Sequence, residues 1–142
     1  MIWFGGDKFM KCVFLALIVL LNGCGTVQHD ETMLCYMPFD RESFGPIDKK
    51  LIEKTKCAGV DDTDILYKKL SEYLDRQNQG NIESAPSRFD EKRVRLKFAS
   101  KSGIYYVDAD GVVELGTVQY RLRDDNKKAI SEILASAFDY HD

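Results

Sequence analysis

Apolar positions along the chain follow three patterns: one continuous run near the start, helical spacing in later segments, and strict alternation between residues 92 and 123. The continuous run covers residues 12–21 (C-V-F-L-A-L-I-V-L-L). A helix that crosses a bilayer needs about 20 apolar residues, whereas the central part of an export signal needs about 7–15. The length of the run therefore predicts an export signal.

Helical spacing predicts two amphipathic helices. The first ends near Gln77, and its apolar arc consists of Leu66, Leu70, Tyr73 and Leu74. Its first turn is expected to be capped by side-chain oxygens of Asp61, Asp62 or Thr63. The second is expected to be capped by Asp124 or Asp125, and its apolar face consists of Ile130, Ile133, Leu134, Ala137 and Phe138.

A third helix, with weaker periodicity, is predicted to begin at Gly45-Pro46 and to end at Gly59. Proline suits the first helical position, because its missing N–H has no partner to lose there.

Between residues 92 and 123 the apolar period changes from 3.6 to 2, which is typical of half-buried strands. The alternating apolar residues are Val94, Leu96, Phe98, Val118, Tyr120 and Leu122. The stretch I-Y-Y-V-D-A-D-G-V-V-E-L-G between them predicts a hairpin, with Asp108 and Gly111 at the first and fourth positions of a type I turn. The predicted fold class is α+β: two N-terminal helices, a four-stranded antiparallel meander, and a C-terminal helix packed on the sheet.

The apolar run ends at a cysteine. Leu21-Asn22-Gly23-Cys24 resembles the lipobox of bacterial lipoprotein signal peptides. The resemblance implies that the Cys24 thiol receives a diacylglycerol, that the chain is cut before this residue, and that the new amine is acylated. In lipoproteins of enteric bacteria an aspartate after the cysteine favours the inner membrane. Gly25 stands there instead, so the resemblance implies the periplasmic leaflet of the outer membrane.

These patterns divide the chain into a signal peptide (1–23), a lipidated tether (24–45) and a single small α+β domain (46–142). A signal opens with positive charge, so we expect translation to begin at Met10, which Lys11 follows. The processed chain would have 119 residues, enough for one domain, with 18 basic and 22 acidic side chains. This mildly acidic balance gives no reason to expect a nucleic acid partner.

The number of cysteines agrees with lipidation. Cys12 leaves with the signal and Cys24 carries the lipid, which leaves Cys35 and Cys57. An even remainder in an exported chain favours a disulfide. A redox pair is the alternative, but the sequence contains no C-x-x-C motif.

Residues that commonly carry chemistry are scarce. The two histidines, His29 and His141, fall in the tether and next to the last residue, so neither a histidine-based catalytic pair nor a histidine zinc site is expected. The turn at Gly111 matches only part of a calcium loop, because Tyr106 and Thr117 would occupy the first and last ligand positions. No catalytic residue, metal or cofactor is predicted.

Five basic residues form the candidate binding surface: Arg93, Arg95, Lys97, Arg121 and Arg123. Alternation along the strands would place all five on the face away from the core. Such a face could hold a lipid phosphate, a glycan carboxylate or an acidic protein. The alternative is a solvated surface whose charges discourage pairing between strand edges.

The sequence as a whole favours a non-enzymatic binding or accessory subunit, held in the bilayer through Cys24 and partnered by an envelope protein. An inhibitor or immunity-type lipoprotein that blocks a toxin, an enzyme or a phage is the first alternative. A hydrolase of cell wall or lipid is the second, because two catalytic carboxylates need only meet in space.

Overall fold

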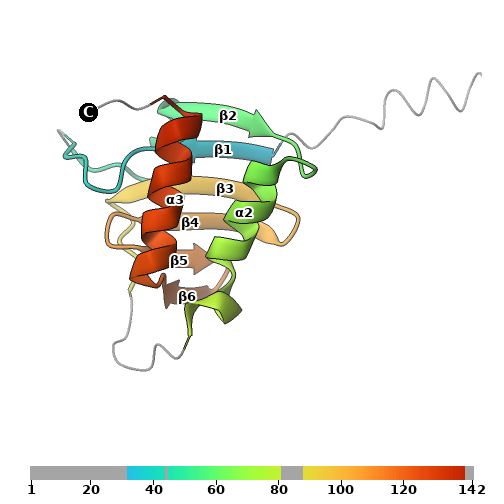
Figure 1. Ribbon diagram of the computed structural model, residues 1–142. Coiled ribbons are helices and arrows are strands. Elements are labelled where there is room, and N and C mark those ends of the chain that lie inside the picture. The colour runs from blue at the N-terminus through green and yellow to red at the C-terminus, as the bar shows by residue number, and fades with distance from the viewer. Residues whose placement is uncertain (1–31, 44, 81–87, 140–142) are drawn as a thin grey trace, which may run out of the picture. The chain divides into compact units, whose positions relative to one another are not determined.

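Six strands form one antiparallel sheet in the computed structural model, which describes residues 32–43, 45–80 and 88–139 (Figure 1). The strands are β1 (Thr32–Tyr36), β2 (Lys56–Val60), β3 (Val94–Ser100), β4 (Gly103–Asp108), β5 (Val112–Leu115) and β6 (Val118–Arg121). Their order across the sheet is β2-β1-β3-β4-β5-β6. Strands β3 to β6 are the predicted meander, and β1 and β2 extend the sheet to six strands where four were predicted.

Helices α2 (Ile65–Leu74) and α3 (Asp124–Ala137) cover one face of this sheet (Figure 1). Both were predicted from the helical spacing, and the α+β class is confirmed. The predicted capping residues are wrong, because Asp64 and Arg123 occupy the N-cap positions and neither makes a side-chain capping hydrogen bond. The described chain also has two short 3-10 helices, η1 (Ile52–Lys54) and η2 (Arg76–Gln79).

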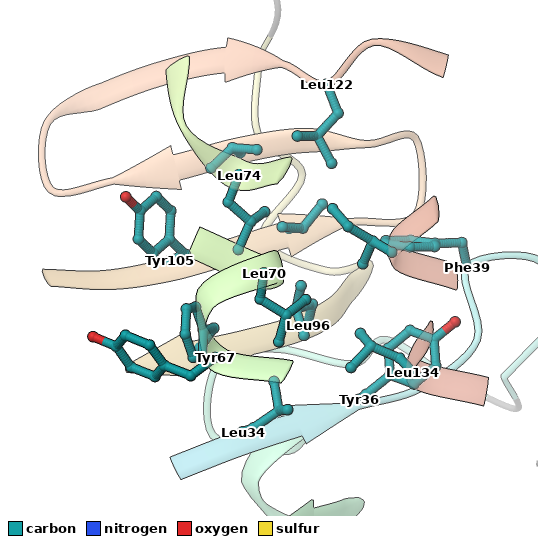
Figure 2. Packing of buried hydrophobic residues seen from close by; sticks show 14 of the residues in the cluster. Leu34, Tyr36, Phe39, Tyr67, Leu70, Leu74, Leu96, Tyr105, Leu122 and Leu134 are labelled. Atoms are coloured by element: carbon teal, nitrogen blue, oxygen red, sulfur yellow. The ribbon is translucent and has the colours of Figure 1, made fainter. Parts of the chain in front are cut away.

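The main core lies between the sheet and the two helices (Figure 2). Leu96 and Phe98 of β3 pack with Leu70 and Leu74 of α2 and with Leu134 of α3, and all five side chains are fully buried. Burying a side chain of this kind contributes about 1.5–3 kcal/mol to stability. Apolar burial therefore holds both helices on the sheet.

The opposite face of the sheet carries a second, smaller core, which consists of Cys35, Ile52, Phe89, Val94 and Val112. Two ion pairs join the segment around η1 to the sheet on this side: Glu53 with Lys97, and Lys49 with Glu114. The face that the alternating pattern predicts to be open is thus partly covered.

The helix predicted after Pro46 is wrong. Its residues form turns, η1 and β2. The Asp48 carboxylate accepts hydrogen bonds from the backbone N–H groups of Lys50 (3.0 Å) and Leu51 (2.8 Å), which supports a single turn. Directly after η1 the chain pairs with β1, so interstrand hydrogen bonds take the place of helical ones.

The predicted tether (24–45) is wrong in its second half, because β1 lies inside the sheet between β2 and β3. Leu34, Cys35 and Tyr36 are consecutive and all buried, so this strand shows no alternation between apolar and polar residues. The folded unit begins at Thr32 rather than at residue 46. The predicted signal peptide, Cys24 and the first part of the tether lie outside the described residues.

A disulfide joins β1 to the edge strand β2. Cys35 and Cys57, the pair left by the cysteine count, stand directly opposite each other in the register of the two strands. Cys35 is fully buried in the second core. The bond closes a loop with a sequence separation of 22 residues and fixes β2 to the rest of the sheet.

The two ends of the sheet are composed of different parts of the chain. One end, called the Thr32 end, contains the start of β1, the turn between β3 and β4, and the turn between β5 and β6. At the other, called the Arg95 end, β1 and β4 finish and β3 and β5 begin. The strands are short, so the two ends are roughly 15–20 Å apart at about 3.3 Å per residue.

Replacing both cysteines (Cys35→Ala with Cys57→Ala) is expected to lower the free energy of unfolding by about 3 kcal/mol, because the open loop gives the unfolded chain more freedom. Urea unfolding of the processed chain measures this difference, and wild-type protein reduced with dithiothreitol should match the double variant. A change below ~1 kcal/mol would show that the crosslink contributes little.

Candidate functional site

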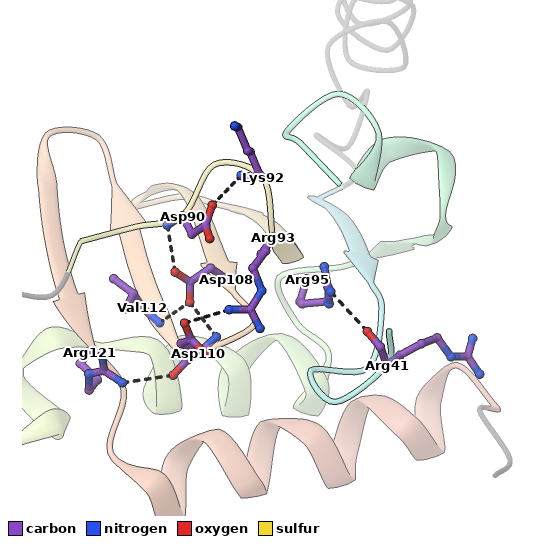
Figure 3. Close-up of polar contacts among 9 residues, drawn as sticks. All are labelled: Arg41, Asp90, Lys92, Arg93, Arg95, Asp108, Asp110, Val112 and Arg121. Atoms are coloured by element: carbon purple, nitrogen blue, oxygen red, sulfur yellow. Dashed lines mark hydrogen bonds and ion pairs between the residues drawn. The ribbon is translucent and has the colours of Figure 1, made fainter. Parts of the chain in front are cut away.

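The Arg95 end is organised around the buried carboxylate of Asp108, which is 1% exposed. Its Oδ1 accepts hydrogen bonds from the N–H groups of Asp110 (3.0 Å) and Val112 (2.9 Å), and its Oδ2 accepts one from the N–H of Asp90 (2.9 Å) (Figure 3). These three bonds join the β4–β5 turn to the segment that leads into β3. Burial raises the pKa of Asp108, while the three N–H donors lower it and offset part of the rise.

The predicted turn from Asp108 to Gly111 is present, with a hydrogen bond from the Gly111 N–H to the Asp108 carbonyl (3.1 Å). Glycine suits its position, because the φ angle is +88°. Two of the predicted basic residues meet at this turn. Arg93 pairs with the Asp110 carboxylate (3.1 Å), and Arg121 donates to the Asp110 carbonyl (3.4 Å).

A β-bulge at the start of β3 decides where Arg95 points. Val94 pairs with Asp108, and Leu96 pairs with Val107, the neighbour of Asp108 in β4. Arg95, between them, is therefore an extra residue with no partner in the register of β4. An extra residue disturbs the alternation of side chains along a strand. Val94 therefore packs in the second core while Leu96 packs in the main core, and the prediction that Arg95 lies on an open face is wrong.

Arg95 is only 4% exposed. Its Nη1 donates to the Val94 carbonyl (3.1 Å). Its Nη2 donates to the Arg41 carbonyl (3.2 Å), as Figure 3 shows. Its Nε has no hydrogen-bond partner, and no described carboxylate forms an ion pair with this guanidinium. Burial lowers the pKa of Arg95, and the nearby charge of Arg93 lowers it further.

An open pocket of about 590 Å³ adjoins this guanidinium. Its described lining consists of Phe39, Asp40, Arg41, Glu42, Ser43, Gly45, Pro46, Lys92, Arg93 and Arg95. Four of these side chains are basic and two are acidic. The volume falls in the range of sites for small ligands, about 300–1,000 Å³.

The other predicted basic residues lie elsewhere. Lys97 pairs with Glu53 on the second face of the sheet, and Arg123 pairs with Asp125 (2.9 Å) at the start of α3. The five residues therefore do not form one surface. Of these five, Arg93 and Arg95 line the pocket. Arg41 and Lys92 also line it, and neither was predicted from the sequence.

The chain matches no family model, no curated protein and no solved structure. Within residues 32–43, 45–80 and 88–139, no helix is long and apolar enough to cross a membrane. The same residues contain no group of three or more His, Cys, Asp or Glu side chains that could hold a metal ion. His29 and His141 lie outside them. Among the described residues, the pocket beside Arg95 is the candidate site, because a buried charged side chain forms part of its wall.

Replacing Asp108 with asparagine is expected to lower the free energy of unfolding by about 1–3 kcal/mol, because an amide N–H₂ would face the Asp90 N–H and leave a buried donor unsatisfied. Asp110→Asn is the matched control. It loses an exposed ion pair with Arg93, worth at most about 1 kcal/mol. Urea unfolding of the three proteins at pH 7 tests the difference, and equal losses would contradict this role of Asp108.

The stability difference between wild type and Asp108→Asn is expected to depend on pH. The pKa of Asp108 is raised in the folded state, so the folded protein binds this proton more tightly than the unfolded chain does. The contribution of Asp108 to stability therefore falls as the pH rises from about 4 through its folded pKa. Unfolding curves at several pH values should show this slope in the wild type and not in the asparagine variant.

Proposed function

We propose that this protein is a lipid-anchored envelope protein that binds a partner through the pocket at its Arg95 end and catalyses no reaction. The observation that supports this best is the position of the pocket. It lies at the opposite end of the sheet from Thr32, the residue through which the folded unit continues to Cys24. An anchor at Cys24 would thus leave the pocket accessible from the periplasm.

The connection between anchor and folded unit would be short. Seven residues, from Gly25 to Glu31, separate Cys24 from Thr32. Even fully extended, such a segment reaches about 25–30 Å. The folded unit would therefore stay close to the bilayer, and its Arg95 end would extend from it by about the length of the sheet, roughly 15–20 Å.

Exposed apolar side chains support this orientation. The described residues have five large hydrophobic side chains that are exposed, and four lie at the Thr32 end: Met33, Ile65, Ile104 and Val118. Met33 and Ile104 are 43% and 45% exposed. Transfer of apolar side chains from water to the boundary between lipid head groups and acyl chains lowers the free energy. This end of the sheet therefore suits contact with the bilayer.

The pocket also suits binding better than catalysis. The most buried charged side chain in its wall is the guanidinium of Arg95. Arginine stays protonated near neutral pH and cannot serve as a general acid or base. A fixed positive charge can, however, recognise an acidic group on a partner. The partner we propose is an envelope component in the periplasm, with the protein on the periplasmic leaflet of the outer membrane.

Lipidation predicts a specific mass and location. In a bacterium that processes lipoproteins, the mature N-terminal peptide should begin at Cys24 and carry a diacylglycerol and an amide-linked acyl chain. Cys24→Ser should move the protein out of the membrane fraction and leave an unprocessed precursor, whose mass would show whether translation begins at Met10. An unmodified Cys24 thiol in the membrane-bound protein would contradict the proposal.

Orientation can be tested with single tryptophans, because the only tryptophan of the chain, Trp3, lies in the predicted signal. With Cys35 and Cys57 in their disulfide, Cys24 is the free thiol of the processed chain and can be coupled to a maleimide lipid. In vesicles of lipids brominated in their acyl chains, Ile104→Trp should be quenched more strongly than Glu91→Trp, which lies at the Arg95 end. Equal quenching would exclude this orientation.

A further inference from the structure

Arg95 is the one buried basic side chain among the described residues, and none of their carboxylates forms an ion pair with it. Two other guanidinium groups there have a carboxylate partner: Arg93 pairs with Asp110, and Arg123 pairs with Asp125. These two are about half exposed, so water also screens their charges. Arg95, by contrast, is only 4% exposed, and its Nη1 and Nη2 donate hydrogen bonds to carbonyl oxygens.

The carboxylates whose charges act on Arg95, those of Asp108 and Asp90, already accept backbone hydrogen bonds. Asp108 accepts three backbone hydrogen bonds, Asp90 accepts one from the Lys92 N–H (3.0 Å), and Asp110 holds Arg93. Attraction from Asp108 and Asp90 raises the pKa of Arg95, but burial outweighs it and the pKa is lowered. A buried charge with no paired partner is unfavourable, so an anion in the adjoining pocket would be stabilised there.

The lining of the pocket agrees with an anionic ligand. Arg41, Lys92 and Arg93 are exposed side chains in its wall, and Arg95 is buried. The acidic residues of the lining, Asp40 and Glu42, are also exposed. The buried part of the wall is therefore positive, whereas the solvent-exposed part carries both signs of charge.

The size of the pocket indicates a ligand larger than a bare ion. Its volume of about 590 Å³ far exceeds that of one water molecule, about 30 Å³ in the liquid. Phe39, 8% exposed, and Pro46 add apolar surface to the lining. The pocket thus has room for an acidic head group together with a small, partly apolar body.

We infer that this pocket binds an oxyanion, a carboxylate or a phosphate, carried by a small molecule or by an acidic side chain of a partner, with Arg95 as its principal counter-charge. Planar guanidinium groups match both kinds of oxyanion through paired hydrogen bonds. The inference names the chemistry of the partner and in that respect rests on the proposed function. Anion binding itself does not depend on lipidation.

The experiment uses the processed chain from residue 24, oxidised and without lipid, so a failure of the lipid anchor cannot affect it. Isothermal titration calorimetry with inorganic phosphate and with N-acetylglutamate, at constant ionic strength against chloride, measures binding. Saturable binding of one or both is expected. Tighter binding of N-acetylglutamate would identify a carboxylate ligand, and tighter binding of phosphate would identify a phosphate ligand. If neither binds more tightly than chloride, the inference is wrong.

Variants separate recognition from folding. Arg95→Met should weaken oxyanion binding by at least about tenfold, the loss of one ion pair. It should also raise the melting temperature in chloride, because an apolar side chain replaces an unpaired buried charge. Lys92→Gln and Arg93→Gln alter exposed positions of the lining and should each weaken binding even if Arg95→Met fails to fold.

The control is Arg121→Gln, which removes a basic residue at the same end but outside the described lining of the pocket. Its affinity for phosphate and N-acetylglutamate should equal that of the wild type. Equal affinity in Lys92→Gln, Arg93→Gln and wild type would overturn the assignment of the site. A loss in Arg121→Gln as large as in Arg93→Gln would show that general surface charge is responsible.

Discussion

The Arg95 end of this protein depends on one buried carboxylate. Asp108 ends β4, and it binds the N–H groups of the turn that follows and of the segment that precedes β3. Val94 lies opposite Asp108 in the register, and the bulge begins there. Because Asp108 fixes the backbone on both sides of this pair, the chain can accommodate an extra residue in β3. The inward position of Arg95, and with it the pocket, follows from that arrangement.

Asp108 and Arg95 illustrate two ways of burying a charge. Asp108 is surrounded by N–H donors, so its burial serves the fold, since buried polar groups stabilise a unique structure when they are fully hydrogen-bonded. Arg95 retains a donor without an acceptor, which costs stability. Natural proteins tend to break such rules at functional sites. The two residues lie on adjacent strands, and they differ in role: the buried polar group of Asp108 supports the fold, whereas that of Arg95 is available to a ligand.

The sequence predicts those helices and strands in which apolar residues recur with a regular period. Helices α2 and α3 each expose one face, and along β3 and β6 apolar residues alternate with polar or charged ones, so their periodicity is visible. Strand β1 is buried on both sides and has no alternating pattern, and β2 is a short edge strand held by Cys57. The site was predicted only in part for a related reason. A bulge disturbs the side-chain alternation without a sequence signal, so Arg95 was predicted to be exposed although it is buried. The loop that brings Arg41 beside it has no periodicity at all.

The position of β1 within the sheet also affects how the protein would withstand mechanical force. A pull applied through the N-terminal segment acts first on β1, which is hydrogen-bonded to β2 on one side and to β3 on the other and is crosslinked to β2. Extraction along the strand direction would have to shear both ladders together, whereas an edge strand could be peeled away one bond at a time. The strand nearest the proposed anchor is thus one of the most firmly held, which suits a molecule attached to a membrane by a single point.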